Sequence, residues 1–152
     1  MNARPLASWL FALIALPLAI RAAELKRSPA IDAQYPAANI QLPPGYVAEL
    51  VAGPPLVRHP MMAGFDDRGR LFISESAGQN LNNKELDAQT PNYVTMLEDT
   101  NGDGFFDKST VFADKMTFPQ GALWYRNALY VCSPPGLWKL EDLDNDGKAE
   151  KR

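Results

Sequence analysis

The sequence has very little cysteine and histidine, and this limits what the chain can do by itself. Among 152 residues there is one cysteine, Cys132, and one histidine, His59. A single cysteine allows no intrachain disulfide, and without a C-x-x-C-H motif this segment cannot itself attach a c-type haem. We therefore expect Cys132 to be a small buried apolar residue.

The sequence also lacks an excess of positive charge. Its 15 lysines and arginines are outnumbered by 18 aspartates and glutamates, which gives a formal net charge of -3. Residues 1–22 hold arginines but no acid, so the remainder of the chain is more acidic still. This balance argues against nucleic acid as a partner.

Sustained helical periodicity is missing as well. Beyond the N-terminal region, apolar residues do not recur at i, i+3, i+4 and i+7 between the prolines and glycines, so no helix is expected there. Residues 1–22 are instead typical of a signal peptide, with Arg4 followed by an apolar stretch from Leu6 to Ile20 and by Ala22-Ala23 for cleavage. We expect an exported protein, periplasmic or at the cell surface. An uncleaved membrane anchor is the alternative.

An acidic motif occurs twice in this sequence. The pattern L-E-D-x-[ND]-x-D-G-x-x-[DE], followed by lysine, begins at Leu97 and again at Leu140, an offset of 43 residues. A repeat of about 40 to 50 residues built from short strands is typical of β-propeller blades. We therefore predict an all-β fold in which residues 45–152 form the first two four-stranded blades of an incomplete propeller, after an extended lead-in at 23–44. A closed propeller needs about four to eight blades, so we expect an N-terminal fragment.

Short apolar or alternating runs between turn residues predict the individual strands. The expected strands are residues 61–65, 70–74, 93–97 and 109–112 in the first unit, and 122–125, 128–132 and 137–140 in the second. A further strand at 46–52 is expected to complete the last blade of a closed ring. The polar stretch 75–92 is predicted to be a long loop, and such loops are commonly functional or mobile.

Each acidic motif presents oxygen ligands at alternate positions of a tight loop. Oxygens at positions 1, 3, 5, 7 and 9, with glycine at position 6, are arranged as in loops that wrap Ca²⁺. The predicted metal ligands are Asp99, Asn101, Asp103, the Phe105 carbonyl and Asp107 in the first loop, and Asp142, Asp144, Asp146, the Lys148 carbonyl and Glu150 in the second. Strand-like flanks, and Thr110 at position 12, favour a strand-to-strand calcium loop over an EF-hand. Asx turns with solvated charge are the alternative.

Strand alternation also predicts where the loops lie. Both acidic loops should sit at one end of the blades, with residues 75–92, 115–121 and His59 at the other. Calcium would then be structural, and any chemistry would belong to the opposite end. No catalytic or cofactor-binding residue is assigned, because simpler explanations exist: His59 as a turn residue, Glu75 as a capping or salt-linked residue, and Gln120 as a loop residue.

Two segments carry a resemblance to a known family. Residues His59 to Glu75, followed by the acidic loop and by Pro119 to Tyr125, resemble the N-terminal part of the membrane-bound dehydrogenase family of planctomycetes and verrucomicrobia. That family comprises exported haem-binding proteins whose propeller is similar to that of glucose/sorbosone dehydrogenases, and the resemblance covers residues 40–152. It implies oxidation of a sugar or alcohol substrate with a PQQ-like quinone, and electron transfer to a downstream c-type haem domain. The family's catalytic histidine and arginine lie in later blades, so neither is carried over.

Two other functions remain open from the residues alone. The first is a non-catalytic secreted propeller, stabilised by calcium, that binds carbohydrate or protein. A C-x-x-C-H motif downstream of residue 152 would favour the dehydrogenase, and a closed propeller without one would favour the binding protein. The second, a dockerin-like adhesion module, would require helices beside the acidic loops.

Overall fold

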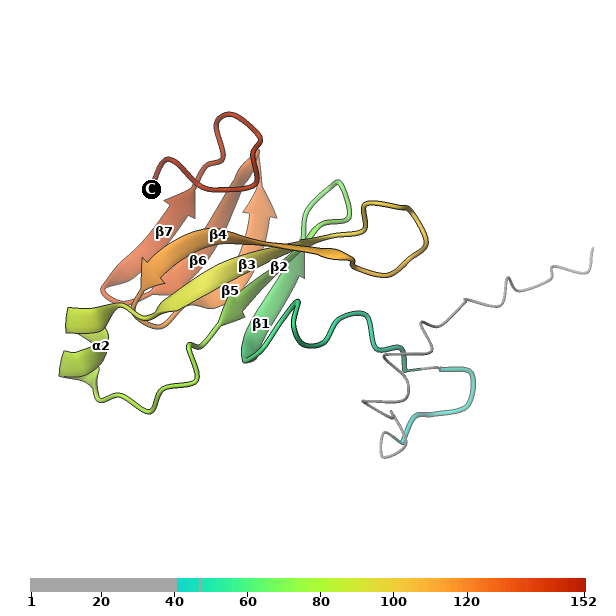
Figure 1. The fold of residues 1–152 in the computed structure, drawn as a ribbon, viewed down its shortest axis with the longest axis horizontal. Coiled ribbons are helices and arrows are strands. Elements are labelled where there is room, and N and C mark those ends of the chain that lie inside the picture. Colours follow the sequence, from blue (N-terminus) through green and yellow to red (C-terminus); the bar gives the residue numbers. More distant parts are fainter. Residues whose placement is uncertain (1–40, 47) are drawn as a thin grey trace, which may run out of the picture.

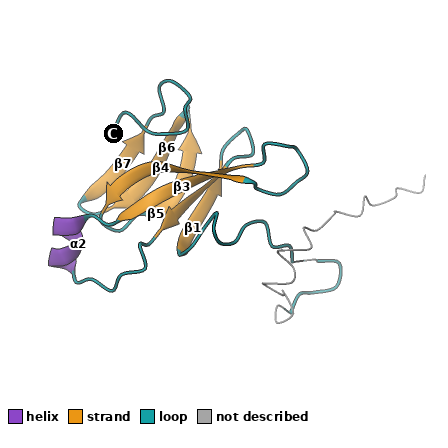
Figure 2. Ribbon diagram, viewed as in Figure 1, coloured by secondary structure: helices purple, strands orange, loops and turns teal. Residues whose placement is uncertain are grey.

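The computed structural model describes residues 41–46 and 48–152, which form two antiparallel β-sheets and one short helix (Figures 1 and 2). The four-stranded sheet has the order β1 (Pro60–Phe65), β2 (Leu71–Glu75), β3 (Asn92–Glu98) and β4 (Lys108–Met116), and the three-stranded sheet has the order β5 (Gln120–Tyr125), β6 (Ala128–Ser133) and β7 (Gly136–Leu140). The described part is therefore predominantly β, as predicted. The proposed signal peptide and most of the lead-in at 23–44 lie outside the described residues.

The sheets pack face to face around one apolar core. The first sheet contributes Phe72, Val94, Met96, Phe112, Ala113 and Met116, and the second contributes Leu129, Val131 and Leu140. The Phe72 ring meets the Phe112 ring edge-on at 4.9 Å and stacks on Trp124 of β5 at 5.4 Å. Aromatic pairs in these geometries add to the stabilisation from burial alone. Trp124 is therefore a packing residue.

β1 and β5 meet where the two sheets join. A Cβ added to Gly64 of β1 would lie 1.9 Å from the Ala122 carbonyl oxygen of β5, so these two backbones approach as closely as glycine allows. Beside them, the Ser74 hydroxyl of β2 donates to the Gly121 carbonyl at 2.8 Å. These contacts fix how the second sheet sits on the first.

The predicted strand at 46–52 is wrong for the residues that the structure describes there. Residues 48–52 form no strand, and Leu56 N and Val57 N instead donate to the Gly53 carbonyl in a turn. Ala52, Leu56 and Val57 pack over Leu71, Ile73 and Leu97 on the outer face of the first sheet. The turn and the prolines at 54 and 55, which lack N–H donors, direct this segment onto the sheet face rather than into the hydrogen-bonded ladder.

The predicted loop at 75–92 contains a helix, α2 (Asn83–Gln89), where none was expected. The Asn82 side chain accepts from Lys84 N and Glu85 N, and the Glu85 side chain accepts from Asn82 N, which completes a capping box. α2 buries none of its residues. It therefore carries no apolar stripe, and a search for apolar periodicity could not find it. No helix within the described part of the chain is long and apolar enough to cross a membrane.

Candidate metal centre

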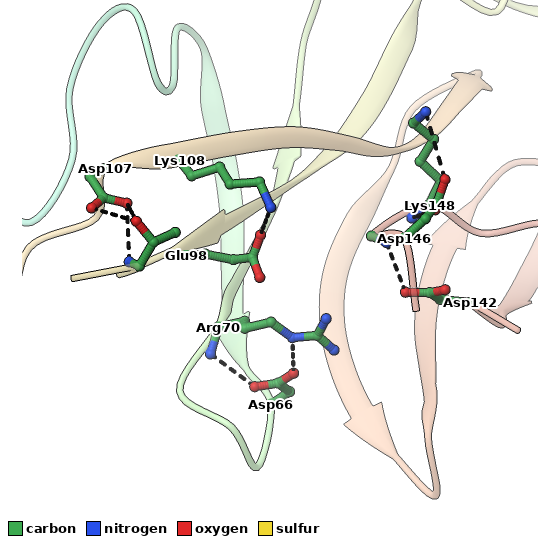
Figure 3. A network of polar contacts seen from close by, with 10 residues as sticks. Asp66, Arg70, Glu98, Asp107, Lys108, Asp142, Asp146 and Lys148 are labelled. Atoms are coloured by element: carbon green, nitrogen blue, oxygen red, sulfur yellow. Dashed lines mark hydrogen bonds and ion pairs between the residues drawn. The ribbon is translucent and has the colours of Figure 1, made fainter. Parts of the chain in front are cut away.

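Both acidic loops connect extended segments in the same register. Glu98 pairs with Lys108 across β3 and β4, and Glu141 pairs with Lys151 through an isolated antiparallel bridge 43 positions later. The side chains repeat this pairing, with Lys108 Nζ 2.7 Å from Glu98 and Lys151 Nζ 2.8 Å from Glu141. Figure 3 shows the first of these ion pairs. No helix flanks either loop, which excludes the EF-hand and dockerin-like arrangements.

The turns themselves are also copies of one another. In each loop the first aspartate accepts from the glycine N–H at position 6, the acid at position 9 accepts from the N–H at position 2, and side-chain oxygens at positions 3 and 5 accept from amides two residues later. The matched bonds are Gly104 N to Asp99 (2.9 Å) and Gly147 N to Asp142 (3.1 Å), Thr100 N to Asp107 (3.1 Å) and Leu143 N to Glu150 (2.8 Å), Asp103 N to Asn101 (2.9 Å) and Asp146 N to Asp144 (3.1 Å), and Phe105 N to Asp103 (2.9 Å) and Lys148 N to Asp146 (2.8 Å).

The second carboxylate oxygen of the first aspartate distinguishes the two loops. Asp99 Oδ1 accepts from Gly102 N at 2.7 Å and from Asp103 N at 3.3 Å. Asp142 Oδ1 is buried and has no hydrogen-bond partner, the one such side-chain atom found among the described residues. A buried acceptor without a partner destabilises the fold by about 1–3 kcal/mol. A hydrogen-bond donor or a cation at this oxygen would remove that cost.

The carboxylates of the second loop also converge. One oxygen from each of Asp142, Asp144, Asp146 and Glu150 lies within 4.8 Å of the others, and among the described residues the first loop forms no comparable group. Such a cluster of hard oxygens suits Ca²⁺. One cation is already nearby, because Lys148 Nζ lies 3.8 Å from Asp146 Oδ2 on the exposed side (Figure 3).

The second loop is held against the first sheet, which explains why Asp142 Oδ1 is buried. Ala149 N donates to the Phe112 carbonyl of β4 at 2.8 Å. Gly147 has φ 90°, a conformation that favours glycine, and an added Cβ would lie 2.8 Å from the terminal methyl of Met96. The first loop contacts the other face of the first sheet through Phe106, and most of its remaining residues are exposed.

Backbone donors stabilise the ionised first loop without a metal. The N–H of Gly104 is the main cause that lowers the pKa of Asp99 below its ordinary value, and the N–H groups of Gly102, Asp103 and Asn101 act in the same direction. Three amide bonds already occupy most of the roughly four acceptor sites of the Asp99 carboxylate. The sequence predicted two equivalent sites, whereas the structure assembles the carboxylates in the second loop alone.

At the opposite end of the strands, Glu75 is buried, and its carboxylate joins β3 to the segment before β1 by hydrogen bonds. It is 1% exposed, and its Oε2 accepts from Arg58 N at 2.8 Å and from His59 N at 3.2 Å. Its Oε1 accepts from Thr95 Oγ1 at 2.5 Å. Burial, and to a lesser degree the Glu75 charge, raises the pKa of Tyr93. Glu75 thus caps the segment that leads into β1, in agreement with its predicted capping role.

The other candidates at this end have mixed outcomes. His59 lies exposed in a bend, as expected of a turn residue, with its imidazole against Gly78, whereas Gln120 begins β5 instead of lying in a loop. The prediction that Cys132 is buried is wrong, because the thiol lies on the outer face of the second sheet, where no described residue covers it. Alternation along β6 places Cys132 opposite Val131, and Val131 is the residue that faces the core.

The fold and the site define a class: a predominantly β protein of two packed antiparallel sheets with a repeated acidic hairpin. A family profile described as a domain of unknown function (DUF7133) matches residues 33–152. The chain belongs to this family. Searches of curated proteins and of solved structures found no match.

Proposed function

We propose that the chain forms the first two blades of a β-propeller in an exported quinoprotein-type dehydrogenase, and that Ca²⁺ in the second acidic loop stabilises them. The propeller is supported by two sheets built on one 43-residue repeat and packed face to face. The observation that carries the calcium site is the convergence of four carboxylates in a loop where one oxygen, Asp142 Oδ1, is buried without a hydrogen-bond partner.

Electrostatics favours a cation at this cluster. Four carboxylates within 4.8 Å repel one another, and a divalent ion would turn that repulsion into attraction while satisfying Asp142 Oδ1. We propose Asp142, Asp144, Asp146 and Glu150 as ligands, with the Lys148 carbonyl completing the set. The first loop would bind calcium more weakly, because Asp99 must first release its amide donors.

The calcium site would support the fold and leave the reaction to other groups. Figure 1 shows the loop between β3 and β4, and the loop after β7, on the side away from α2. The dehydrogenase role itself depends on the resemblance of residues 59–75 and 119–125. By that resemblance, a PQQ-like quinone and a c-type haem belong to later parts of such proteins, and the substrate is a sugar or an alcohol.

Calcium titration of the whole chain tests the metal site. We expect Ca²⁺ to bind by isothermal titration calorimetry and to raise the melting temperature of the wild type. Asp142→Asn should lose most of both effects, because it removes a negative charge from the cluster and replaces one carboxylate oxygen with an amide NH2 group. Asp67→Asn, an exposed acid in the turn between β1 and β2, is the matched control and should respond like the wild type. Equal calcium binding by Asp142→Asn and wild type would contradict the site.

The redox role needs a separate measurement. A longer form of the protein that includes a C-x-x-C-H domain should reduce its haem when a sugar or alcohol is added to enzyme reconstituted with PQQ. The haem absorbance spectrum reports this reduction directly. A haem that stays oxidised with every sugar and alcohol tested would contradict a dehydrogenase while leaving the calcium site standing.

A further inference from the structure

A cavity of about 350 Å³ lies at the end of the strands away from the acidic loops. Three segments form its wall: the end of α2, the end of β4, and the turn between β6 and β7. Its lining includes Asp87, Thr90, Lys115, Thr117, Ser133 and Trp138. Its volume falls at the lower end of the range of small-molecule sites, about 300–1,000 Å³.

One wall of the cavity is an aromatic face held in a fixed orientation. The indole N–H of Trp138 donates to the Ser133 carbonyl at 2.8 Å, and the residue remains 36% exposed. Because its polar edge is already bonded within the protein, Trp138 presents ring surface to the cavity and needs no donor from a ligand.

The floor of the cavity is a hydrogen-bonded network that joins both sheets. Thr117 Oγ1 bonds to Ser133 Oγ at 3.0 Å and donates to the Pro134 carbonyl, while Ser133 Oγ accepts from Phe118 N at 3.0 Å. Asn92, which is 3% exposed, donates to the Thr117 carbonyl at 2.5 Å. These bonds hold the floor in place without a ligand.

One lining residue has a strained backbone. Lys115 has φ 52°, in the left-handed region that side-chain-bearing residues rarely adopt, and it lies where the register of β3 and β4 shifts. Thr90, with φ 42°, is the C-cap of α2, and Arg126, Asn127 and Asn145 lie in tight turns; positive φ is common in both places. Strain such as that of Lys115 is found where the surrounding structure enforces it, commonly at binding sites.

The cavity is electrically balanced. Arg152, which also lines it, is engaged by Asp114 through bonds of 2.7 and 2.8 Å. The charge of Lys115 also acts on Asp114, whose pKa it helps Arg152 to lower. The two bases at the cavity, Lys115 and Arg152, are thus matched by the two acids Asp87 and Asp114, so an anionic ligand would meet Asp87 and a cationic ligand would meet Lys115.

We propose that this cavity binds a neutral monosaccharide. The apolar face of the sugar ring would stack on Trp138, Asp87 would accept hydrogen bonds from its hydroxyl groups, and Lys115 would donate to them. A hydroxyl group both donates and accepts, so a neutral polyol satisfies both charged residues at once. This assignment names a binding site for the substrate class of the proposed function. It rests on that function for the expectation that a sugar binds at this end of the strands.

Binding of D-glucose to the whole chain, followed by isothermal titration calorimetry and by tryptophan fluorescence, tests the assignment. Trp138→Ala, Asp87→Asn and Lys115→Met should each weaken binding about tenfold or more, because each removes one of the three contacts. The matched controls are Tyr125→Ala, Asp67→Asn and Lys84→Met, which change the same kinds of side chain outside the cavity and should bind like the wild type. Circular dichroism melts establish that each variant is folded.

The outcomes separate this inference from the metal site. Weaker glucose binding by the three cavity variants, with unchanged calcium binding, would support it. No glucose binding by wild type, equal binding by the cavity variants, or binding of D-glucuronate in place of D-glucose would overturn it. If Asp142→Asn lost calcium binding in the same experiments, only the sugar assignment would fall.

Discussion

Asp99 and Asp142 occupy the same position of a repeated hairpin, yet their carboxylates have different surroundings. Both oxygens of Asp99 accept amide N–H groups, whereas Asp142 has one buried oxygen without a donor. The two loops also have different neighbours, since the second is bonded to β4 through Ala149 and the first contacts the outer face of the sheet through Phe106. The same sequence motif therefore gives one turn whose first aspartate is hydrogen-bonded through both oxygens, and one candidate metal site.

The pH dependence of the free energy of unfolding should show the effect of the amide N–H groups that surround the Asp99 carboxylate. Because the folded-state pKa of Asp99 lies below its ordinary value of 3.8, its ionised form stabilises the fold above that value, and this contribution is lost as the pH falls through the folded-state pKa. Asp99→Asn should therefore show a smaller loss of stability on acidification than the wild type. Urea unfolding in calcium-free buffer at about pH 7 and about pH 3 measures the difference. Identical acid sensitivity in the two proteins would contradict this reading.

Residue types alone nominated the candidate ligands, but could not rank the two loops. Alternating oxygens and a glycine at position 6 follow from sequence spacing. Whether a carboxylate oxygen is free depends on the directions of nearby amides and on burial, and burial depends on contacts between the loop and the sheet, such as the bond from Ala149 N to the Phe112 carbonyl. Glu75 shows the same limit, because its donors come from residues 58 and 59 in a distant segment.

At the scale of elements, the close approach of β1 and β5 determines how the sheets join. Gly64 leaves no room for a side chain, and the neighbouring bond from Ser74 to Gly121 repeats the contact through β2. Arg70, paired with Asp66 at 2.6 Å, adds a further link (Figure 3), since its guanidinium lies 5.6 Å from the centre of the Trp124 ring. The junction is thus made of backbone contact flanked by specific side chains.

A methyl group at this junction should separate the sheets. Gly64→Ala would place a Cβ 1.9 Å from the Ala122 oxygen, and we expect a loss of about 1–3 kcal/mol in the free energy of unfolding. Gly136→Ala in β7 is the matched control, because no atom lies within 4 Å of the added Cβ. Urea denaturation of both variants provides the comparison. Equal stability of the two variants would show that β1 and β5 do not meet as closely as described.

α2 is the helix that the search for apolar periodicity in the sequence did not predict. Its residues are all outside the core, and its start is specified by the reciprocal bonds of Asn82 and Glu85. The signal N-x-x-E was present in the sequence, but a capping box alone, without an apolar face, does not distinguish a one-turn cap from a helix. The tertiary structure places the end of this helix at the rim of the cavity, where Asp87 and Thr90 lie.

At the scale of the whole molecule, the second sheet has one covered face and one open face. Leu129, Val131 and Leu140 face the core, while Leu123, Tyr125 and Leu137 are 66%, 53% and 68% exposed. The register pairs Leu123 with Tyr130 and Leu137 with Cys132, which puts these side chains on the same open face. Contiguous apolar surface of this kind promotes association.

We expect the chain to self-associate through this open face. The double variant Leu123→Lys with Leu137→Lys should remain monomeric at concentrations at which the wild type associates, because two ammonium groups would have to be desolvated at the contact. Val111→Lys, at a residue 48% exposed on β4, is the matched control and should associate like the wild type. Sedimentation velocity over a range of concentrations distinguishes these cases. A wild-type chain that stays monomeric and melts cooperatively would contradict the expectation.

The sequence by itself determined the seven strands, the acidic turns and the candidate ligands, because strand alternation and turn chemistry are local properties of neighbouring residues. Only the tertiary structure decided that residues 52–57 cover a sheet face, that Cys132 is exposed, and that the carboxylates gather in one loop and not in both. Each of these outcomes depends on packing contacts between segments that are distant in the sequence. Burial and the supply of amide donors are therefore settled by contacts between residues far apart in the chain.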